Sequence, residues 1–194
     1  MLLSRFCFME RTMCDLLKKS ALAYKDLSAY EYTLICGRKG VQTQVAIRFP
    51  ASAYHHLAGF QYARLAALRQ QKHALDVILN GGVSLAQLMA SGFQHRDRLE
   101  SLVCLRKHLE ANQFVFRYRG HGCAYSKIRA EYLMLFGDIV LFTDAAIPVS
   151  IFKVKNPSMR YEQGCPRLTV LQIRRRHLET GEETITYQWE KYTI

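Results

Sequence analysis

Two adjacent histidines, His55 and His56 in the segment YHHLAG at residues 54–59, are the side chains of this sequence best suited to acid–base chemistry. Ser52 is expected to cap a short helix that carries both of them, and adjacent helical residues point about 100° apart. Both therefore cannot face the core, so one should reach solvent or a site. Histidine titrates near neutral pH and suits proton transfer to and from oxygen atoms of a substrate. The alternative is a surface histidine beside a half-buried one, without a function. Four more histidines are expected at the surface: His73, His95, His108 and His177.

Pairs of cations separated by one residue recur in the second half of the chain. Three such pairs are Arg117 and Arg119, Lys127 and Arg129, and Arg174 and Arg176. On a strand the two members of each pair point to the same face, where they could contact successive phosphates. The alternatives are a solvated outer face of a sheet and, for the run that ends at Arg176, an edge strand protected from aggregation by its charge.

The chain as a whole is strongly basic. Its 194 residues include 27 Lys and Arg against 16 Asp and Glu, a net charge of +11 with neutral histidines. Such a charge costs self-repulsion, which a polyanionic partner would relieve. Nucleic acid is the commonest such partner and an anionic membrane the second, while a basic surface with no use for its charge is the remaining alternative.

The absence of several known motifs argues against the classes of enzyme and binding site that use them. It has no phosphate-binding Gly-x-x-x-x-Gly-Lys, no dinucleotide-binding Gly-x-Gly-x-x-Gly after a strand and no Gly-x-Ser-x-Gly. Its acids are scattered rather than paired, which argues against a two-metal nuclease and favours chemistry in which the RNA 2′-hydroxyl is the nucleophile. The six cysteines are widely spread without a Cys-x-x-Cys, so no zinc site is expected. The sequence thus predicts neither a metal nor a cofactor.

A cytoplasmic protein is expected, without a membrane partner. No apolar stretch approaches the length that spans a bilayer. The first nine residues are apolar but interrupted by Arg5, and they lack the long apolar core and cleavage site of a signal peptide.

The elements that must position these residues differ between the two halves of the chain, with mainly helices expected in the first half and strands in the second. Helices are expected over about 8–27, from Ser52, over 70–79, from Ser84 with a capping box to Gln87, and over 94–111 with Leu99, Leu102, Val103 and Leu109 as its apolar stripe. Strands are expected over 30–36, 41–49, 114–118, 126–136, 139–143, 148–154, 167–177 and 183–189.

Short connections between neighbouring strands favour antiparallel pairing. The expected fold class is α+β, with N-terminal helices and an early β-hairpin packed on a C-terminal antiparallel β-meander. We expect one domain over 1–194, with a mainly helical half at 1–112 that includes the hairpin 30–49 and a sheet half at 113–194.

Five motifs, in this order, resemble the phage and mobile-element branch of the Barnase–EndoU–Colicin–RelE-like nuclease superfamily. They are Ile-Arg-Phe at 47–49, YHHLAG at 54–59, SKIRAEY at 126–132, PVSIF at 148–152, and Tyr161-x-Gln163 before the strand at Val170. The resemblance covers about residues 30–175. Two positions depart from the family pattern, since Tyr54 replaces a usual phenylalanine and Ile151 replaces an aromatic residue.

The resemblance implies an antiparallel sheet behind N-terminal helices, with a metal-independent ribonuclease site on the sheet. His56, rather than His55, matches the histidine of the family motif, and Lys127 and Ser150 match its later segments. On this basis His56 is the expected general base or acid on the RNA, and Lys127 neutralises the scissile phosphate. Ser150 and Tyr161 bind the phosphate or share the proton transfer. The residues predicted to bind nucleic acid are Arg117, Arg119, Arg129, Arg160, Arg174 and Arg176.

The sequence therefore predicts a toxin-like or phage-type endoribonuclease, for which an antitoxin or immunity protein is a possible partner besides RNA. A non-catalytic nucleic-acid-binding accessory protein of a phage or plasmid is the first alternative, and an inhibitor of a host protein is the second. His56 and Lys127 should approach one concave surface in an enzyme and lie on opposite sides of the sheet in a binding protein. The sequence does not indicate an oligomeric state.

Overall fold

The computed structural model of this chain describes residues 16–120, 128–156 and 158–192. The described chain begins with a helix at residues 16–28, so the expected positions 8–15 of this helix lie outside the described residues. An antiparallel hairpin follows, made of β1 (Tyr30–Arg38) and β2 (Val41–Arg48). Its turn contains Lys39 and Gly40, both at positive φ. The expected hairpin is confirmed.

Short helices connect this hairpin to one longer helix. They are α2 (Ala51–Leu57), 3₁₀ turns at Phe60–Tyr62, Ala66–Leu68 and Gln71–His73, α3 (Ala74–Leu79), α4 (Leu85–Ala90) and α5 (Arg96–Glu110). Pro50 is the residue before α2 and no side chain caps that helix, so the prediction of Ser52 as its cap is wrong. The expected helix 70–79 is divided into a 3₁₀ turn and α3. The capping box of α4 is confirmed, because Ser84 and Gln87 bond reciprocally to each other's backbone.

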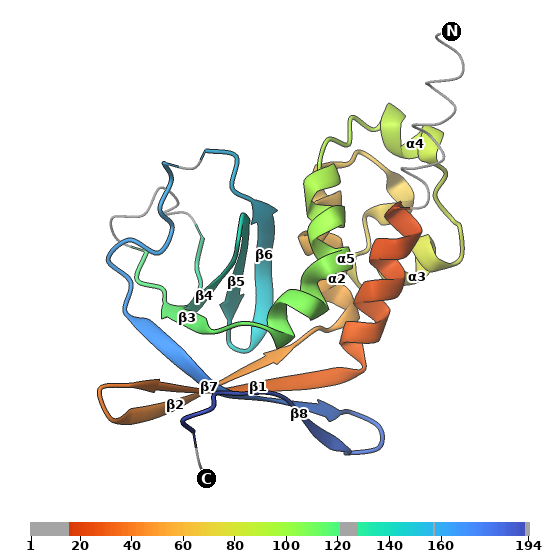
Figure 1. Cartoon of the computed structure of the whole chain (residues 1–194). Helices are drawn as coiled ribbons and strands as arrows, with labels where there is room; N and C mark the ends of the chain where they lie inside the picture. The colour runs from red at the N-terminus through yellow and green to blue at the C-terminus, as the bar shows by residue number, and fades with distance from the viewer. Residues whose placement is uncertain (1–15, 121–127, 157, 193–194) are drawn as a thin grey trace, which may run out of the picture.

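The remaining strands form a single curled antiparallel sheet with the hairpin (Figure 1). They are β3 (Phe114–Arg117), β4 (Tyr132–Phe136), β5 (Ile139–Asp144), β6 (Ile147–Lys153), β7 (Arg167–His177) and β8 (Glu183–Gln188). The order is β2-β1-β7-β3-β4-β5-β6, and β8 pairs only with the second half of β7. The α+β fold class is confirmed. The expected strand 126–136 is shorter than predicted, because residues 128–131 are not in a strand and 126–127 lie outside the described residues.

Strand β7 connects the early hairpin to the later strands, because it pairs with β1 along one side and with β3 and then β8 along the other. The two ends of the strand order also meet. The backbone N–H of Arg48, at the end of β2, donates to the carbonyl of Ala146 in the turn before β6, at 2.8 Å. The sheet therefore curls around the helices, and in Figure 1 β6 stands directly beside α2 and α5.

Two apolar clusters lie on opposite faces of the sheet at β4 and β5. Residues Met134 and Leu141 belong to the large cluster under the helices, whereas Leu133 and Phe142 belong to a smaller one on the other face. Alternating side chains of a strand point to opposite faces. A strand covered on both faces is consequently apolar throughout, as β4 and β5 are.

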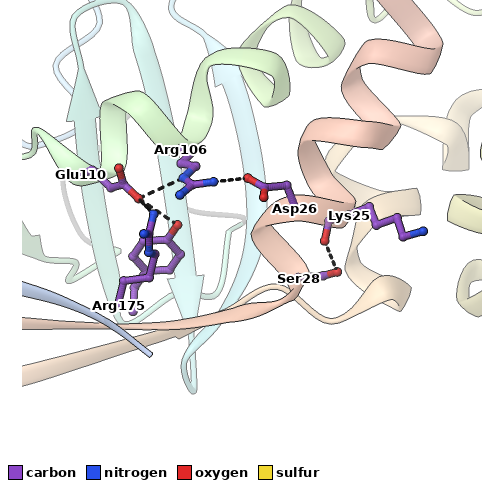
Figure 2. A network of polar contacts seen from close by, with 7 residues as sticks. Lys25, Asp26, Ser28, Arg106, Glu110 and Arg175 are labelled. Atoms are coloured by element: carbon purple, nitrogen blue, oxygen red, sulfur yellow. Dashed lines mark hydrogen bonds and ion pairs between the residues drawn. The ribbon is translucent and has the colours of Figure 1, made fainter. Parts of the chain in front are cut away.

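The helix α5 presents its apolar stripe to the large cluster and its end to a polar network. Leu99, Leu102 and Leu109 are buried as predicted, whereas Val103 is 36% exposed and its predicted place in the stripe is wrong. At the C-terminal end of α5, the Glu110 carboxylate accepts bonds from Arg106 (3.1 Å), Arg175 (2.9 Å) and the Tyr32 hydroxyl (3.3 Å). Arg106 also pairs with Asp26 of the first helix (Figure 2). This network fixes α5 to β1, β7 and the first helix, and so sets where the N-terminal end of α5 lies.

Candidate active site

The C-terminal end of α2 packs directly on the N-terminal end of α5. Gly59 follows α2 with a φ of +84°, and a Cβ atom there would lie 2.9 Å from the Cβ of His95 and 3.0 Å from the Cδ of Arg98. Glycine is thus required both by the left-handed backbone and by the close approach. Arg98 also donates to the carbonyl of His56 at 3.3 Å. These contacts place His56 and His95 at one junction, although 39 positions separate them in the sequence.

The two adjacent histidines of α2 have different surroundings, as the helix geometry predicts. His55 is only 4% exposed and packs against Phe60, with ring centroids 6.3 Å apart. His56 is exposed and lines a cavity. Rotation about the helix axis puts His55 in the core and leaves His56 for chemistry.

The cavity has a volume of about 730 Å³ and lies between this helix junction and β6. Its described lining comprises His56, Gln61, Tyr62, His95, Asp97, Arg98, Ile128, Arg129, Val149, Ser150, Phe152, Lys153, Lys155, Asn156, Met159 and Tyr161. The volume lies within the range of about 300–1,000 Å³ that small-molecule sites occupy. One wall is helical, and the other comes from β6 and the segment after it.

On the sheet side, Ser150 and Tyr161 are both largely buried. Ser150 sits on β6 at 8% exposure, opposite Phe142 of β5. The Tyr161 ring packs edge-on against Phe152, with centroids 5.5 Å apart, and its hydroxyl donates to the Met159 sulfur at 3.4 Å. The small apolar cluster on the outer face of β4–β6 thus holds Tyr161 in the cavity wall.

Positive charge dominates the cavity. Its described lining holds four permanent cations, namely Arg98, Arg129, Lys153 and Lys155, and a single carboxylate, Asp97. Lys153 is paired with Glu100 of α5 at 2.9 Å, which connects β6 to the helix wall. An anion such as a phosphate group is therefore the ligand that this cavity favours.

The pKa values of both cavity histidines are lowered. For His56 the larger cause is desolvation and the second is the positive charge of Arg98. For His95 desolvation again comes first, followed by Arg98, while Asp97 opposes the shift and Lys155 adds to it. Lower pKa values favour neutral imidazole rings at neutral pH, and a neutral imidazole is able to accept a proton.

The residues predicted from the sequence are only partly brought together. His56, Ser150, Tyr161 and Arg129 all line the cavity. Lys127 lies outside the described residues, although the two residues that follow it, Ile128 and Arg129, are in the lining.

The other predicted cations do not line the cavity. They are Arg117, Arg119, Arg160, Arg174 and Arg176. Arg160 pairs with Glu162 at 2.7 Å, and Arg174 lies 3.5 Å from Glu183. Arg176 pairs with Glu31, which also binds Arg48. Most of these side chains therefore already have a carboxylate partner.

Sequence reasoning missed several residues of the cavity. His95, expected at the surface, is half-buried in the cavity wall. The other missed lining residues include Arg98, Lys153, Lys155 and Tyr62. Lys153 and Lys155 form one more pair of cations separated by one residue, a pattern that could have indicated them, whereas no spacing pattern indicates His95, Arg98 or Tyr62. For the helical wall the local signal is Gly59, because a glycine at the end of a helix permits another segment to approach closely.

Among the residues that the structure describes, no three His, Cys, Asp or Glu side chains are grouped so that they could hold a metal ion. No helix within the described ranges is long and apolar enough to cross a membrane.

Comparison with known proteins decides the family. The profile of the phage-Barnase-EndoU-ColicinE5/D-RelE like nuclease4 family matches residues 16–188. The chain belongs to this nuclease family. Membership confirms the resemblance seen in the ordered motifs, and it supports a nuclease function with a nucleic-acid substrate. No curated protein and no solved structure matches the chain.

Proposed function

We propose that this member of the nuclease4 family is a metal-independent endoribonuclease whose site is the cavity between α2, α5 and β6. The observation that carries the proposal is the convergence of His56, Ser150 and Tyr161 in one cationic cavity with a second histidine, His95. Ser150 and Tyr161 lie about a hundred residues from His56 in sequence, so their meeting is a property of the fold.

The proposed reaction is attack of an RNA 2′-hydroxyl on the adjacent phosphorus. One neutral histidine removes the 2′-hydroxyl proton while the O2′–P bond forms, and a protonated group delivers a proton to the 5′-oxygen while the P–O5′ bond breaks. The products are a 2′,3′-cyclic phosphate and a 5′-hydroxyl. His56 takes one of these roles, and His95 is placed to take the other. Histidine suits both, because its pKa lies near the working pH.

Charge on the phosphate rises as the reaction proceeds, and the cavity is built to stabilise it. Arg98, Arg129 and Lys155 supply fixed positive charge, with Lys127 as the predicted fourth contributor. Ser150 and Tyr161 supply hydroxyl groups to hold the phosphate oxygens. Pre-arranged charge of this kind is usually the largest contribution to such a rate. A lining with one described carboxylate and several cations is also a poor ligand set for Mg²⁺, whose usual ligands are carboxylates and other oxygens.

A non-catalytic nucleic-acid-binding protein is the alternative. It predicts that His56 and the segment around Lys127 lie on opposite sides of the sheet. Ile128 and Arg129 share the cavity with His56, which supports the enzyme. In the proposed role the protein cuts cytoplasmic RNA, and an antitoxin or immunity protein is its expected inhibitor.

The test is cleavage of total RNA and of a defined tRNA by the purified protein in EDTA. The variants are His56→Ala and, as a matched control, His73→Ala, since His73 is exposed and outside the cavity. We expect wild type and His73→Ala to cut, His56→Ala to lose about 10²–10⁴-fold in rate, and the fragments to end in 2′,3′-cyclic phosphate. A requirement for magnesium, or fragments with a plain 3′-hydroxyl, would rule out this mechanism. Salt-sensitive binding without cleavage would favour the alternative.

A further inference from the structure

Tyr62 is an exposed aromatic side chain in the lining of the charged cavity. It ends the 3₁₀ turn Phe60–Tyr62, in which the Phe60 side chain is buried at 1% exposure. Tyr62 is 57% exposed and lines the cavity. Leaving an aromatic ring in water forgoes the free energy of burial, so an open ring inside a charged cavity points to a ligand.

The Tyr62 ring is held in place by two neighbours from the start of α5. Its centroid lies 4.6 Å from that of His95, at an interplanar angle of 41°. The Arg98 guanidinium carbon lies 6.0 Å from the same centroid. Both neighbours belong to the proposed site, and Arg98 also bonds the carbonyl of His56. A ring with this support loses little further conformational freedom when a ligand stacks on it.

From this geometry we propose that Tyr62 is the stacking platform for one nucleobase next to the scissile phosphate, and that the substrate is therefore unpaired RNA. The inference rests on the proposed ribonuclease function. Aromatic rings in proteins bind RNA by stacking on bases that are splayed out of a strand, and a base inside a duplex cannot present its face. The nearby cations bind the phosphate, so Tyr62 supplies the aromatic contact that a nucleotide needs besides charge. Stacking on tyrosine accepts every base, so little sequence preference is expected from this contact alone.

The test measures binding separately from cleavage. The probe is a short single-stranded RNA that carries 2′-fluoro groups throughout, so that no 2′-hydroxyl nucleophile is present. A second probe has the same backbone, length and charge but no bases. Dissociation constants of wild type, Tyr62→Ala and Tyr62→Phe are measured for both probes at one fixed salt concentration, because phosphate binding varies steeply with salt. Trp189→Ala is the matched control, since Trp189 is an aromatic residue with 40% exposure that does not line the cavity.

We expect Tyr62→Ala to weaken binding of the base-containing probe about 5- to 150-fold, the range for loss of one stacked base. Binding of the baseless probe should change less than about 2-fold, and Tyr62→Phe should behave as wild type because it keeps the ring. Trp189→Ala should change neither. In cleavage assays, Tyr62→Ala should lower the rate on single-stranded RNA by a similar factor.

Equal losses for the base-containing and baseless probes would overturn the proposal, because Tyr62 would then act only by supporting His95 and Arg98. Wild-type affinity in Tyr62→Ala would overturn it too, as would cutting of a fully paired RNA as fast as of a single strand. Failure of the ribonuclease proposal looks different. In that case no RNA is cut in EDTA, while the preference of wild type for the base-containing probe and its loss in Tyr62→Ala still report the base subsite.

Discussion

The cavity and the part of the sheet formed by β1, β2, β7 and β8 are both rich in cations, but the cations are placed differently in the two regions. In the sheet region, Arg48 of β2 and Arg176 of β7 share the carboxylate of Glu31 on β1, and Arg174 lies beside Glu183 of β8. In the cavity, four cations surround two histidines with one carboxylate, Asp97, in the described lining. In Figure 1, β1, β7 and β8 lie below the helices and β6, and residues of α2, α5 and β6 line the cavity. A basic sequence therefore marks a site only where the fold leaves positive charge in excess.

The largest expected effect is that of His95→Ala, which tests whether the cavity needs both histidines. If His95 transfers a proton, the variant should lose about 10²–10⁴-fold in kcat/KM, as His56→Ala does. The pH profile of kcat/KM is the deciding measurement, because removal of one proton-transfer group removes one limb of a bell-shaped curve. If the pH profile of His95→Ala keeps both limbs, His95 does not transfer a proton and only supports the Tyr62 ring.

Gly59→Ala should push the C-terminal end of α2 away from the N-terminal end of α5. The new Cβ would meet His95 and Arg98, and the backbone there has a positive φ. We expect a loss of about 1–3 kcal/mol in the free energy of unfolding, and a loss of activity at temperatures where the variant is fully folded. The measurements are urea denaturation and cleavage assays.

Gly181→Ala in the β7–β8 hairpin is the matched control for this variant. Its φ is +72°, but a Cβ there would have open space around it, so it isolates the backbone strain. It should be destabilised by about 1 kcal/mol and keep full activity. Equal effects of the two substitutions on activity would show that the contact of Gly59 with α5 does not matter for the site.

Arginine replacements compare the two regions directly through the salt dependence of RNA binding. One lost phosphate contact lowers the slope of log K against log salt by about 0.7 on a single strand. Arg129→Ala should show that change, while Arg176→Ala should show a smaller one because Arg176 is already paired with Glu31. The sequence also predicts that Arg174 and Arg176 bind nucleic acid. A full change of slope in Arg176→Ala would support that prediction and remove the contrast between the regions.

The smallest effect concerns Glu31 of β1 and the stability of the pairing of β1 with β2 and β7 at low pH. Hydrogen bonds from Arg176 lower the pKa of Glu31 most, and those from Arg48 add to this, although partial burial opposes it. Because the folded-state pKa is depressed, the stabilisation is present above the ordinary pKa of about 4.3 and is lost as the pH falls through the lowered value. Glu31→Gln should cost about 1 kcal/mol or less at pH 7 and make the stability less dependent on pH between about 5 and 3. A variant with the wild-type pH dependence would argue against this ion pair.

Much of the secondary structure follows from patterns within the sequence, because it depends on neighbours along the chain. Alternation predicts most strands to within two residues, and the turn at Lys39 and Gly40 and the capping box of Ser84 are where their local chemistry places them. The errors also have local causes. Pro50 rather than Ser52 precedes α2, because proline's fixed φ suits a helix start. Residues 128–131 have strand-like composition but are not in a strand, and the first two of them, Ile128 and Arg129, line the cavity.

The sequence by itself determined the basic charge, the α+β class, the family motifs and the fact that only one of His55 and His56 could face the core. Helix geometry and strand alternation are sufficient for these conclusions. The tertiary structure alone decided that His55 is the buried histidine, that His95, Arg98 and Tyr62 join His56, and that Arg174 and Arg176 are paired with carboxylates. These outcomes depend on how α5 packs on α2 and on how β7 pairs with β1 and β8. Such contacts join residues far apart in sequence, and no local spacing records them.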